Sequence, residues 1–427
     1  MTKSFSIPEN HPQRFKLHNE VHARAPVSLE LPVSCTFMAL TLTAEEKKEE
    51  FFYLNNLCER YGVTPPKSDA THFSATLDSF KFRWEQHAEF SSYSFYVQSN
   101  SENPFSKLAL EQVPVAWLND LPGKIIVAAH ASIIKATTPP TPNAEFFASN
   151  PIVGSEVTGG AAHAFTDFKI HADGFSRLLI HDYHLKAGQA GRLLQRLFEI
   201  EVYRVMAMLA FPIAIQLTPE LNEADSQLLN ITSAMAKPDS NDAELLDELT
   251  TLAAKVENNI STHQYRFSAS NAYFNLVELR IKELREQRIQ GLQTIGEFMN
   301  RRLEPAASTC TSTTSRFDSL SKRISNAGQL LRTRVDITIE RQNQALLTSM
   351  DLRAKMQLRL QETVEGLSIV AITSYIVSLI GSITKAANTS DWINLNPTLT
   401  TGLSIPIVLI IVALAVRRIH KKIHTDN

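Results

Sequence analysis

Glycine and cysteine are both scarce in this sequence, and each scarcity disfavours a class of protein. The chain has 14 glycines in 427 residues, about half of the usual share of roughly 7%. Doubly wound nucleotide-binding folds need glycine in their phosphate-binding turns, and neither a GxxxxGK[ST] loop nor a GxGxxG motif occurs. The three cysteines, Cys35, Cys58 and Cys310, are too far apart for a CxxC metal pair or a disulfide framework.

The chain also has little excess charge. Its formal net charge is -2, with 20% charged and 44% hydrophobic residues, which excludes a disordered or highly charged chain. The length of 427 residues predicts two or three folded units. A mean hydropathy of -0.12 is typical of a soluble protein, but the apolar residues concentrate near the C-terminus.

Two uncharged runs of 18 residues each, 367–384 and 399–416, lie close to the C-terminus. Each run has the minimum length for a bilayer-spanning helix. The first run contains several serines and threonines, so a buried core helix is its alternative interpretation. The linker between the runs, with Trp392 and Pro397, suits a two-helix transmembrane hairpin. We therefore expect the chain to enter a lipid bilayer.

Basic residues flank the two runs on the outside of the expected hairpin. Positive charges prefer the cytoplasmic side of a membrane, so both termini are expected in the cytoplasm, with 417–427 as a basic tail. The first 15 residues contain no apolar signal-peptide core, and we expect about 365 residues on the cytoplasmic side. The flanking residues are Arg353, Lys355, Arg359, Arg417, Arg418, Lys421 and Lys422, against Lys385 in the linker.

The fold class expected from the pattern is α+β, with a mixed α/β domain over 1–186. An apolar, β-prone segment predicts a strand over 32–42, and a threonine followed by an acidic turn predicts a helix over 43–61. Polar and aromatic positions alternate over 71–98, which predicts two or three antiparallel strands. Further strands are expected over 124–134 and 152–185, with a turn at 172–174.

From residue 187 onward the pattern predicts helices. The helical region 187–315 contains expected helices over 191–211, ended or kinked by Pro212, over 220–260 and over 263–303. The polar segment 308–315 predicts a break before a stalk helix over 316–366. The apolar positions of this stalk recur with a period near that of a coiled coil, and we expect it to continue into the first membrane helix.

Charge is unevenly distributed along the helical region. Residues 219–260 carry nine acidic residues against two lysines, and residues 280–365 carry fifteen basic residues against ten acidic ones. A basic region can contact anionic lipid or nucleic acid. Here the basic residues alternate with acidic ones, which favours helices that pack and neutralise each other. No nucleic-acid partner is expected.

Four segments carry a family resemblance: 18–24 (HNEVHAR), 191–204 (GRLLQRLFEIEVYR), 332–336 (RTRVD) and 361–368 (QETVEGLS). Together they resemble an uncharacterised bacterial membrane-anchored family, domain of unknown function 3422. The resemblance implies a location in the bacterial inner membrane and supplies no catalytic residues or cofactor. The residues of these segments whose role stays open are Asn19, Glu20, Arg24, Arg192, Arg196, Glu199, Glu201, Arg204, Glu362 and Glu365.

A second resemblance is architectural. A cytoplasmic α/β domain, long helices and a two-span hairpin are similar to the layout of CorA-type magnesium channels. Those channels carry a Gly-Met-Asn triplet at the outer end of the first span, whereas residues 380–385 here read IGSITK. The resemblance implies an oligomeric ion channel or transporter as an alternative function.

Histidines provide the candidate chemistry. His18 and His22 are four residues apart, so on a helix the two imidazoles would share a face and could bind a metal; a hydrogen-bonded loop is the alternative. This is not the HExxH pattern of zinc proteases. His181 and Asp182 form a candidate acid–base pair, against the alternative that His171, His181 and His184 are scattered surface residues.

Two helices carry candidate interaction sites. In 191–204, the spacing of Arg192, Arg196 and Glu199 predicts a partly buried polar network, which either docks a partner or anion or holds the helix on the β domain. In the first apolar run, small polar residues recur every fourth position and form a stripe. This stripe packs on the second span, mediates oligomerisation or lines a pore; its residues are Ser374, Ser378 and Ser382.

The leading functional interpretation is a non-enzymatic scaffold, sensor or assembly factor at the membrane. It would bind a cytoplasmic protein partner and associate with further copies of itself as a homo-oligomer. The alternative is the channel or transporter described above. A metal-dependent hydrolase, which depends only on His18 and His22, comes last.

Overall fold

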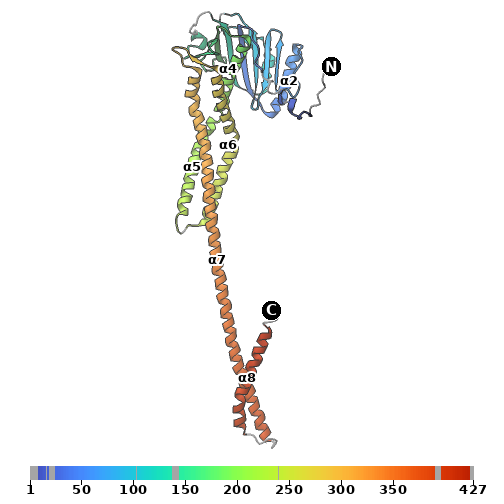
Figure 1. Ribbon diagram of the computed structural model, residues 1–427, viewed down its shortest axis with the longest axis vertical. Coiled ribbons are helices and arrows are strands. Elements are labelled where there is room, and N and C mark those ends of the chain that lie inside the picture. The colour runs from blue at the N-terminus through green and yellow to red at the C-terminus, as the bar shows by residue number, and fades with distance from the viewer. Residues whose placement is uncertain are drawn as a thin grey trace. The chain divides into compact units, whose positions relative to one another are not determined.

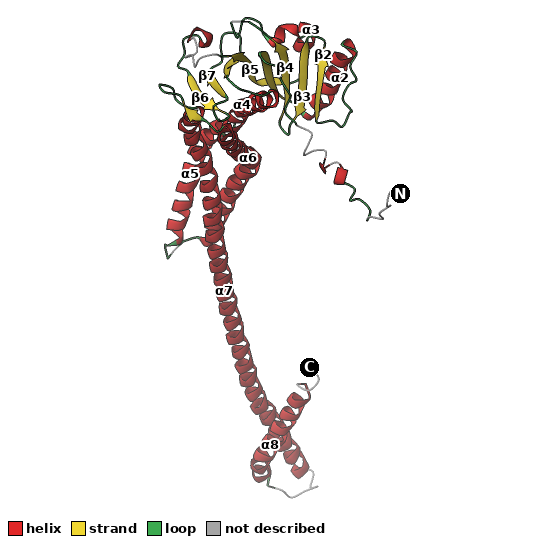
Figure 2. Cartoon of the chain, turned by 45° about the horizontal axis from the view of Figure 1, so that its top comes forward, coloured by secondary structure: helices red, strands yellow, loops and turns green. Residues whose placement is uncertain are grey.

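A mixed sheet forms the N-terminal part of the computed structural model, which describes residues 8–15, 17–18, 25–101, 103–136, 144–238, 240–389 and 396–423 (Figures 1 and 2). Within these residues the sheet has nine strands: β1 (Val33–Thr41), β2 (His72–Leu77), β3 (Phe80–Gln86), β4 (Phe90–Gln98), β5 (Lys124–Lys135), β6 (Val153–Val157), β7 (Ala162–Thr166), β8 (Ser176–Asp182) and β9 (Gln287–Arg288). Their order in the sheet is β2-β3-β4-β1-β5-β8-β7-β6-β9. Strands β5 and β8 are parallel, and the other pairs are antiparallel.

The helices of the described residues are α2 (Ala44–Arg60), α3 (Val115–Asn119), α4 (Ala187–Met208), α5 (Phe211–Met235), α6 (Asp242–Leu284), α7 (Ile295–Thr389) and α8 (Pro397–Ile423). The chain divides into two compact units. We call Met1–Ser240 with Asp247–Gly328 the sheet unit, and Asn241–Leu246 with Gln329–Asn427 the C-terminal unit. An α+β class with a mixed sheet is therefore confirmed.

The expected strands over 32–42, 71–98, 124–134 and 152–185 are present, as β1, β2–β4, β5 and β6–β8. The turn over 172–174 is present too, because the Gly174 amide donates to the His171 carbonyl. Thr43 begins α2 as predicted: its hydroxyl accepts from the Glu46 amide, and the Glu46 carboxylate accepts from the Thr43 amide. This reciprocal pairing satisfies two amides that a helix start leaves without partners.

Each face of the sheet has its own hydrophobic core. One core joins β1, β5 and β8 to α4, through residues such as Phe37, Ile133 and Leu194. The other joins the aromatic residues of β3 and β4 to α2, through residues such as Trp84 and Leu54. Alternate residues of a strand point to opposite faces, so each aromatic strand contributes one set of side chains to each side.

Helix α4 ends at Met208 and α5 begins at Phe211, with Pro212 in its first turn, so the predicted effect of Pro212 is confirmed. The predicted helix boundary near 260–263 is wrong, because α6 continues from Asp242 to Leu284. Val256 and Phe267, on either side of that point, are both buried. The apolar face of α6 is therefore continuous across the expected boundary.

The predicted break over 308–315 is also wrong, since α7 is one helix from Ile295 to Thr389. Cys310 and Thr313 are buried against neighbouring helices. The hydroxyls of Thr309, Thr313 and Thr314 donate to the carbonyls four residues earlier, at 2.8, 2.9 and 3.1 Å. These bonds satisfy the polar side chains within the helix, so the serine- and threonine-rich segment does not interrupt it.

Ion pairs join the acidic helices to the basic one within the sheet unit. Asp225 of α5 accepts from Arg316 and Arg323 of α7 at 3.1 and 2.8 Å. Within the acidic region itself, Lys255 of α6 also pairs with Glu223 of α5 at 3.0 Å. The expectation that acidic and basic helices neutralise each other is therefore confirmed.

Three helical stretches are long and apolar enough to cross a membrane by length and composition alone: Ala187–Met235, Ile295–Asn388 and Thr398–Arg418. Half of the most apolar window of the first stretch is buried inside the protein, against 11% of the windows in the other two. Gly381 of α7 lies close to α8, because a Cβ atom there would lie 3.2 Å from the Thr401 hydroxyl. Trp392 lies outside the described residues.

Candidate functional site

A cavity with charged walls lies in the sheet unit, where the face of the sheet that carries α4 continues onto β3 and β4. Its volume is about 260 Å³. Strands β1, β3 and β4, helices α4 and α6, and Val27 line it. Its polar lining residues are Arg83, Glu85, His87, Ser92, Ser94, Gln195, Glu199 and Arg280.

The sheet wall of the cavity carries one ion pair. Arg83 and Glu85 are two residues apart on β3 and so share a face, and Arg83 Nη2 lies 2.7 Å from Glu85 Oε1. The two side chains are only 8% and 12% exposed. Arg83 Nη1 also donates to the Ala25 carbonyl at 2.7 Å. Ser94 and Ser92 lie opposite the pair on β4.

The helix wall carries a second ion pair. Arg280 of α6 donates from Nε to Glu199 of α4, and from Nη1 to Glu283 at 3.1 Å. Gln195 Nε2 donates to Glu199 at 2.9 Å, and Arg196 Nε donates to Glu283 at 3.1 Å. Burial lowers the pKa of Arg280, but the charges of Glu199 and Glu283 outweigh it and raise the pKa overall. The guanidinium therefore stays charged.

Gly191 allows the chain before β1 to pass close to α4. A Cβ atom at this position would lie 1.8 Å from the Val27 carbonyl oxygen, which is far inside van der Waals contact. Any larger residue at 191 forces the two segments apart. The backbone contact places Val27 beside the 191–204 segment. One of the four family segments, 191–204, thus lines this cavity.

The predicted residues of the 191–204 segment take different positions. Arg192 is exposed, whereas Arg196 and Glu199 are half-buried, and Glu199 lines the cavity. Arg196 pairs with Glu283, and Glu199 with Arg280, so both residues belong to a half-buried polar network whose partners lie on α6. The partners come from α6, about 80 residues later in the chain, which no local spacing can indicate.

Glu201 and Arg204 form a separate pair on α4. Glu201 is 1% exposed, and Arg204 Nη2 donates to its Oε2 atom at 2.6 Å. The Arg204 guanidinium also lies over the Phe168 ring, 5.3 Å from its centre. These contacts hold α4 against the loop after β7.

Sequence reasoning did not find Arg83, Glu85 or Arg280 as site residues. A signal was present in β3, where Lys81, Arg83 and Glu85 alternate with three aromatic residues. The aromatic positions predict the buried face of the strand. The charged positions belong to the opposite face, which is half-buried and on which few apolar side chains pack.

Of the histidines near the last strands, His184 is exposed as expected and His171 is half-buried, but the surface position expected for His181 is wrong. His181 is 3% exposed, and it lies opposite His163 on the neighbouring strand. Burial, and then the charge of His163, lower the pKa of His181 to about 4. Asp182 is not positioned as its acid–base partner, because its Oδ1 atom accepts from the Leu185 amide at 2.7 Å. His171 bonds to the buried Asp167 at 2.9 Å.

His18 is exposed, whereas its proposed metal-binding partner His22 lies outside the described residues, as do Asn19, Glu20 and Arg24. Among the residues that are described, no group of three or more histidine, cysteine or acidic side chains could hold a metal ion.

The predicted residues of the C-terminal unit are mostly exposed. Ser374, Ser378 and Ser382 are all exposed on α7. Thr373 is buried and Gly381 half-buried, so a neighbouring face of α7 approaches α8. Glu362 is exposed and Glu365 half-buried.

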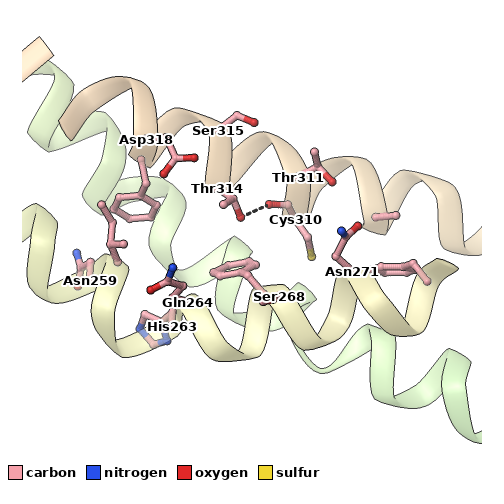
Figure 3. A pocket seen from close by; sticks show the side chains of 15 residues that line it. Asn259, His263, Gln264, Ser268, Asn271, Cys310, Thr311, Thr314, Ser315 and Asp318 are labelled. Carbon is pink, nitrogen blue, oxygen red and sulfur yellow. Dashed lines mark hydrogen bonds between the residues drawn. The ribbon is translucent and has the colours of Figure 1, made fainter. Parts of the chain in front are cut away.

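A second cavity, of about 330 Å³, lies between α6 and α7 within the sheet unit. Figure 3 shows its polar residues along the two helices, with the Cys310 sulfur directed toward α6. Phe267 and Phe317 supply apolar lining. Burial raises the pKa of the Cys310 thiol, so it stays protonated and is a poor nucleophile.

These features define an α+β protein with a charged cavity beside its sheet and with apolar C-terminal helices of membrane-spanning length. The chain belongs to the family described as "Protein of unknown function (DUF3422)", which matches residues 9–423. The comparison with curated proteins gives no match, and the comparison with solved structures gives none either. The predicted membership of this uncharacterised family is thereby confirmed.

Proposed function

We propose that the protein is a membrane-anchored scaffold or sensor without catalysis of its own. Residues 367–384 and 399–416 cross the bacterial inner membrane as a hairpin, and both termini lie in the cytoplasm. The sheet unit then works on the cytoplasmic side, where it binds a protein partner, and copies of the chain associate with one another.

The exposure of the two apolar helical segments carries this proposal. Tyr375 and Ile383 of α7 are 72% and 62% exposed, and Ile407 and Ile411 of α8 are 56% and 60% exposed. Removing one such side chain from water is worth about 1.5–3 kcal/mol. Insertion into a bilayer removes the apolar side chains of both helices from water. Within the bilayer, a helix satisfies its backbone N–H and C=O groups by its own hydrogen bonds. The basic residues that flank the segments support the cytoplasmic orientation.

Lysines placed in the middle of both segments test the anchor. The double variant Tyr375→Lys/Ile407→Lys is expected to leave the membrane fraction, because each central lysine costs about 2.5–3.5 kcal/mol on insertion. The measurement is the share of the chain that stays with membranes after an alkaline carbonate wash. Leu229→Lys, at a 61% exposed position of α5, is the control and should stay bound. Retention of the double variant at the wild-type level would refute the anchor.

The fully exposed segment of α7, residues 336–364, supports self-association. Every residue from 336 to 364 is exposed, and five of the apolar ones recur within a narrow stripe at helical spacing. In water such a stripe is stabilised by pairing with the same stripe of a second copy, as in a coiled coil. The stripe consists of Ile339, Leu346, Met350, Leu360 and Val364.

Glutamine substitutions in this stripe test the association. Leu346→Gln/Leu360→Gln is expected to lower the oligomeric state of the full chain, measured by light scattering in mild detergent. Leu347→Gln/Leu358→Gln is the matched control, because these exposed leucines lie on a face about 100° away around the helix. A monomeric wild type, or an equal effect of the control, contradicts the proposed interface.

A further inference from the structure

The charged walls of the cavity beside α4 have no structural explanation in the packing of the sheet. Helix α4 covers β1 and β5 with apolar side chains, but the same face of β3 and β4 carries Arg83, Glu85 and Ser94. Burying ion pairs gains little stability compared with apolar residues of similar volume. In binding sites, a few convergent polar groups of this kind fix the orientation of a bound ligand.

Several polar atoms on these walls are not used by the hydrogen bonds within the protein. Among the described residues, Gln195 Oε1 is buried and accepts no hydrogen bond. The bonds of Arg280 use Nε and Nη1, which leaves Nη2 as a donor. The ion pair of Glu85 uses Oε1, which leaves Oε2 as an acceptor. The cavity therefore offers acceptors from α4 and β3 and a charged donor from α6.

The charge of the lining restricts the ligand. Two arginines and two glutamates line the cavity, so their charges cancel. A ligand with a net charge would leave one unpaired charge in a half-buried place, which is costly. A ligand that carries one charge of each sign meets a partner for both.

The size restricts it further. Drug-sized ligands occupy cavities of roughly 300–1,000 Å³, and this cavity measures about 260 Å³. It also exceeds by several-fold the roughly 30 Å³ that one water molecule takes up in the liquid. The fitting occupant is a small organic molecule.

We propose that this cavity binds a small zwitterion of the free α-amino acid class. The carboxylate of the ligand pairs with the guanidinium of Arg280, and its ammonium donates to Gln195 Oε1 and Glu85 Oε2. Guanidinium and carboxylate match each other in planar geometry, which gives the carboxylate a defined position. Every residue involved belongs to the sheet unit, so the proposal does not depend on the membrane anchor.

The test uses the full-length protein in detergent, mixed with each of the common amino acids in turn. At least one amino acid is expected to raise the melting temperature and to give saturable binding by calorimetry, because a ligand that binds the folded state stabilises it. The amine that lacks its carboxylate, and the acid that lacks its ammonium, should each bind at least tenfold more weakly. A neutral sugar and a dicarboxylate complete the panel.

A single substitution locates the binding. Gln195→Met keeps the length of the side chain and removes its acceptor, and it is expected to weaken binding at least tenfold. Gln227→Met, at a half-buried glutamine of α5 that does not line the cavity, is the matched control and should bind as the wild type does. The unliganded melting temperature of both variants reports whether they fold.

Three results would overturn the proposal. These are the absence of a response to every amino acid, equal binding by Gln195→Met and the wild type, and preferred binding of the sugar or the dicarboxylate. Because the assay needs no bilayer, failure of the membrane anchor would not change its outcome.

Discussion

Replacing Glu50 with alanine is expected to destabilise the sheet unit by about 3–5 kcal/mol, because several buried hydrogen-bond donors share its carboxylate as their acceptor. Glu50 lies on α2 and is fully buried. Its carboxylate accepts from Trp84 Nε1 at 2.8 Å, from Ser91 Oγ at 2.9 Å and from the Tyr93 hydroxyl. Without the carboxylate these buried donors lose their acceptor, at about 1–3 kcal/mol for each unsatisfied group.

The donors cannot compensate by losing protons. Burial, and then the charge of Glu50, raise the pKa of Tyr93 well above its ordinary value, so its hydroxyl keeps its proton. The indole N–H of Trp84 is a donor only. Both groups lie in the aromatic core between β3, β4 and α2, where water does not replace the lost acceptor.

Denaturant unfolding of the full chain, followed by tryptophan fluorescence, measures this effect. Glu49→Ala is the control, because Glu49 is the exposed neighbour on the same helix and should change stability by less than about 0.5 kcal/mol. Glu50→Gln should fall between the two, since its amide retains one acceptor oxygen. A loss for Glu50→Ala no larger than that for Glu49→Ala would show that the carboxylate is not structurally required.

Local signals in the sequence predicted much of the sheet unit. The start of α2 was predictable because Thr43 and Glu46 satisfy each other within four residues. The strands β2–β4 were predictable because the aromatic positions alternate with polar ones, and alternation reports which face is buried. In each case the residues that determine the structure are neighbours in the chain.

The rest depends on contacts between distant segments. The serine- and threonine-rich segment 308–315 was expected to break the helix, but packing buries Cys310 and Thr313 there, and tertiary packing overrides a weak local preference. The cavity combines β3, α4 and α6, so its composition was not predictable from the spacing within any one of them. Glu50 gave no signal either, because it is one of several acidic residues at the start of α2.

Acidification is expected to unfold the sheet unit through two buried histidines. His130 is 2% and His181 3% exposed. Burial, and then the charge of Arg177, lower the pKa of His130 to about 4, and burial, and then His163, lower that of His181 to about 4. The charge of Asp173 acts in the opposite direction on His130. The Nδ1 atom of His130 lies 2.8 Å from the Thr36 hydroxyl.

The sign of the effect follows from which state binds protons first. The unfolded histidines take up protons near pH 6.5, whereas the folded ones stay neutral until about pH 4. Between these values the unfolded state binds more protons, so stability falls as the pH is lowered. Above pH 6.5 both states are neutral and the histidines contribute no pH dependence. Each histidine accounts for a loss of about 3 kcal/mol over the whole window.

The double variant His130→Asn/His181→Asn separates this effect from that of the carboxylates, which also titrate in acid. It is expected to be less stable than the wild type at pH 7 but to lose less stability between pH 7 and pH 4, as measured by denaturant unfolding at each pH. His72→Asn, at an exposed position of β2, should keep the wild-type slope. If the double variant lost stability as steeply as the wild type, the acid sensitivity would have to come from other groups.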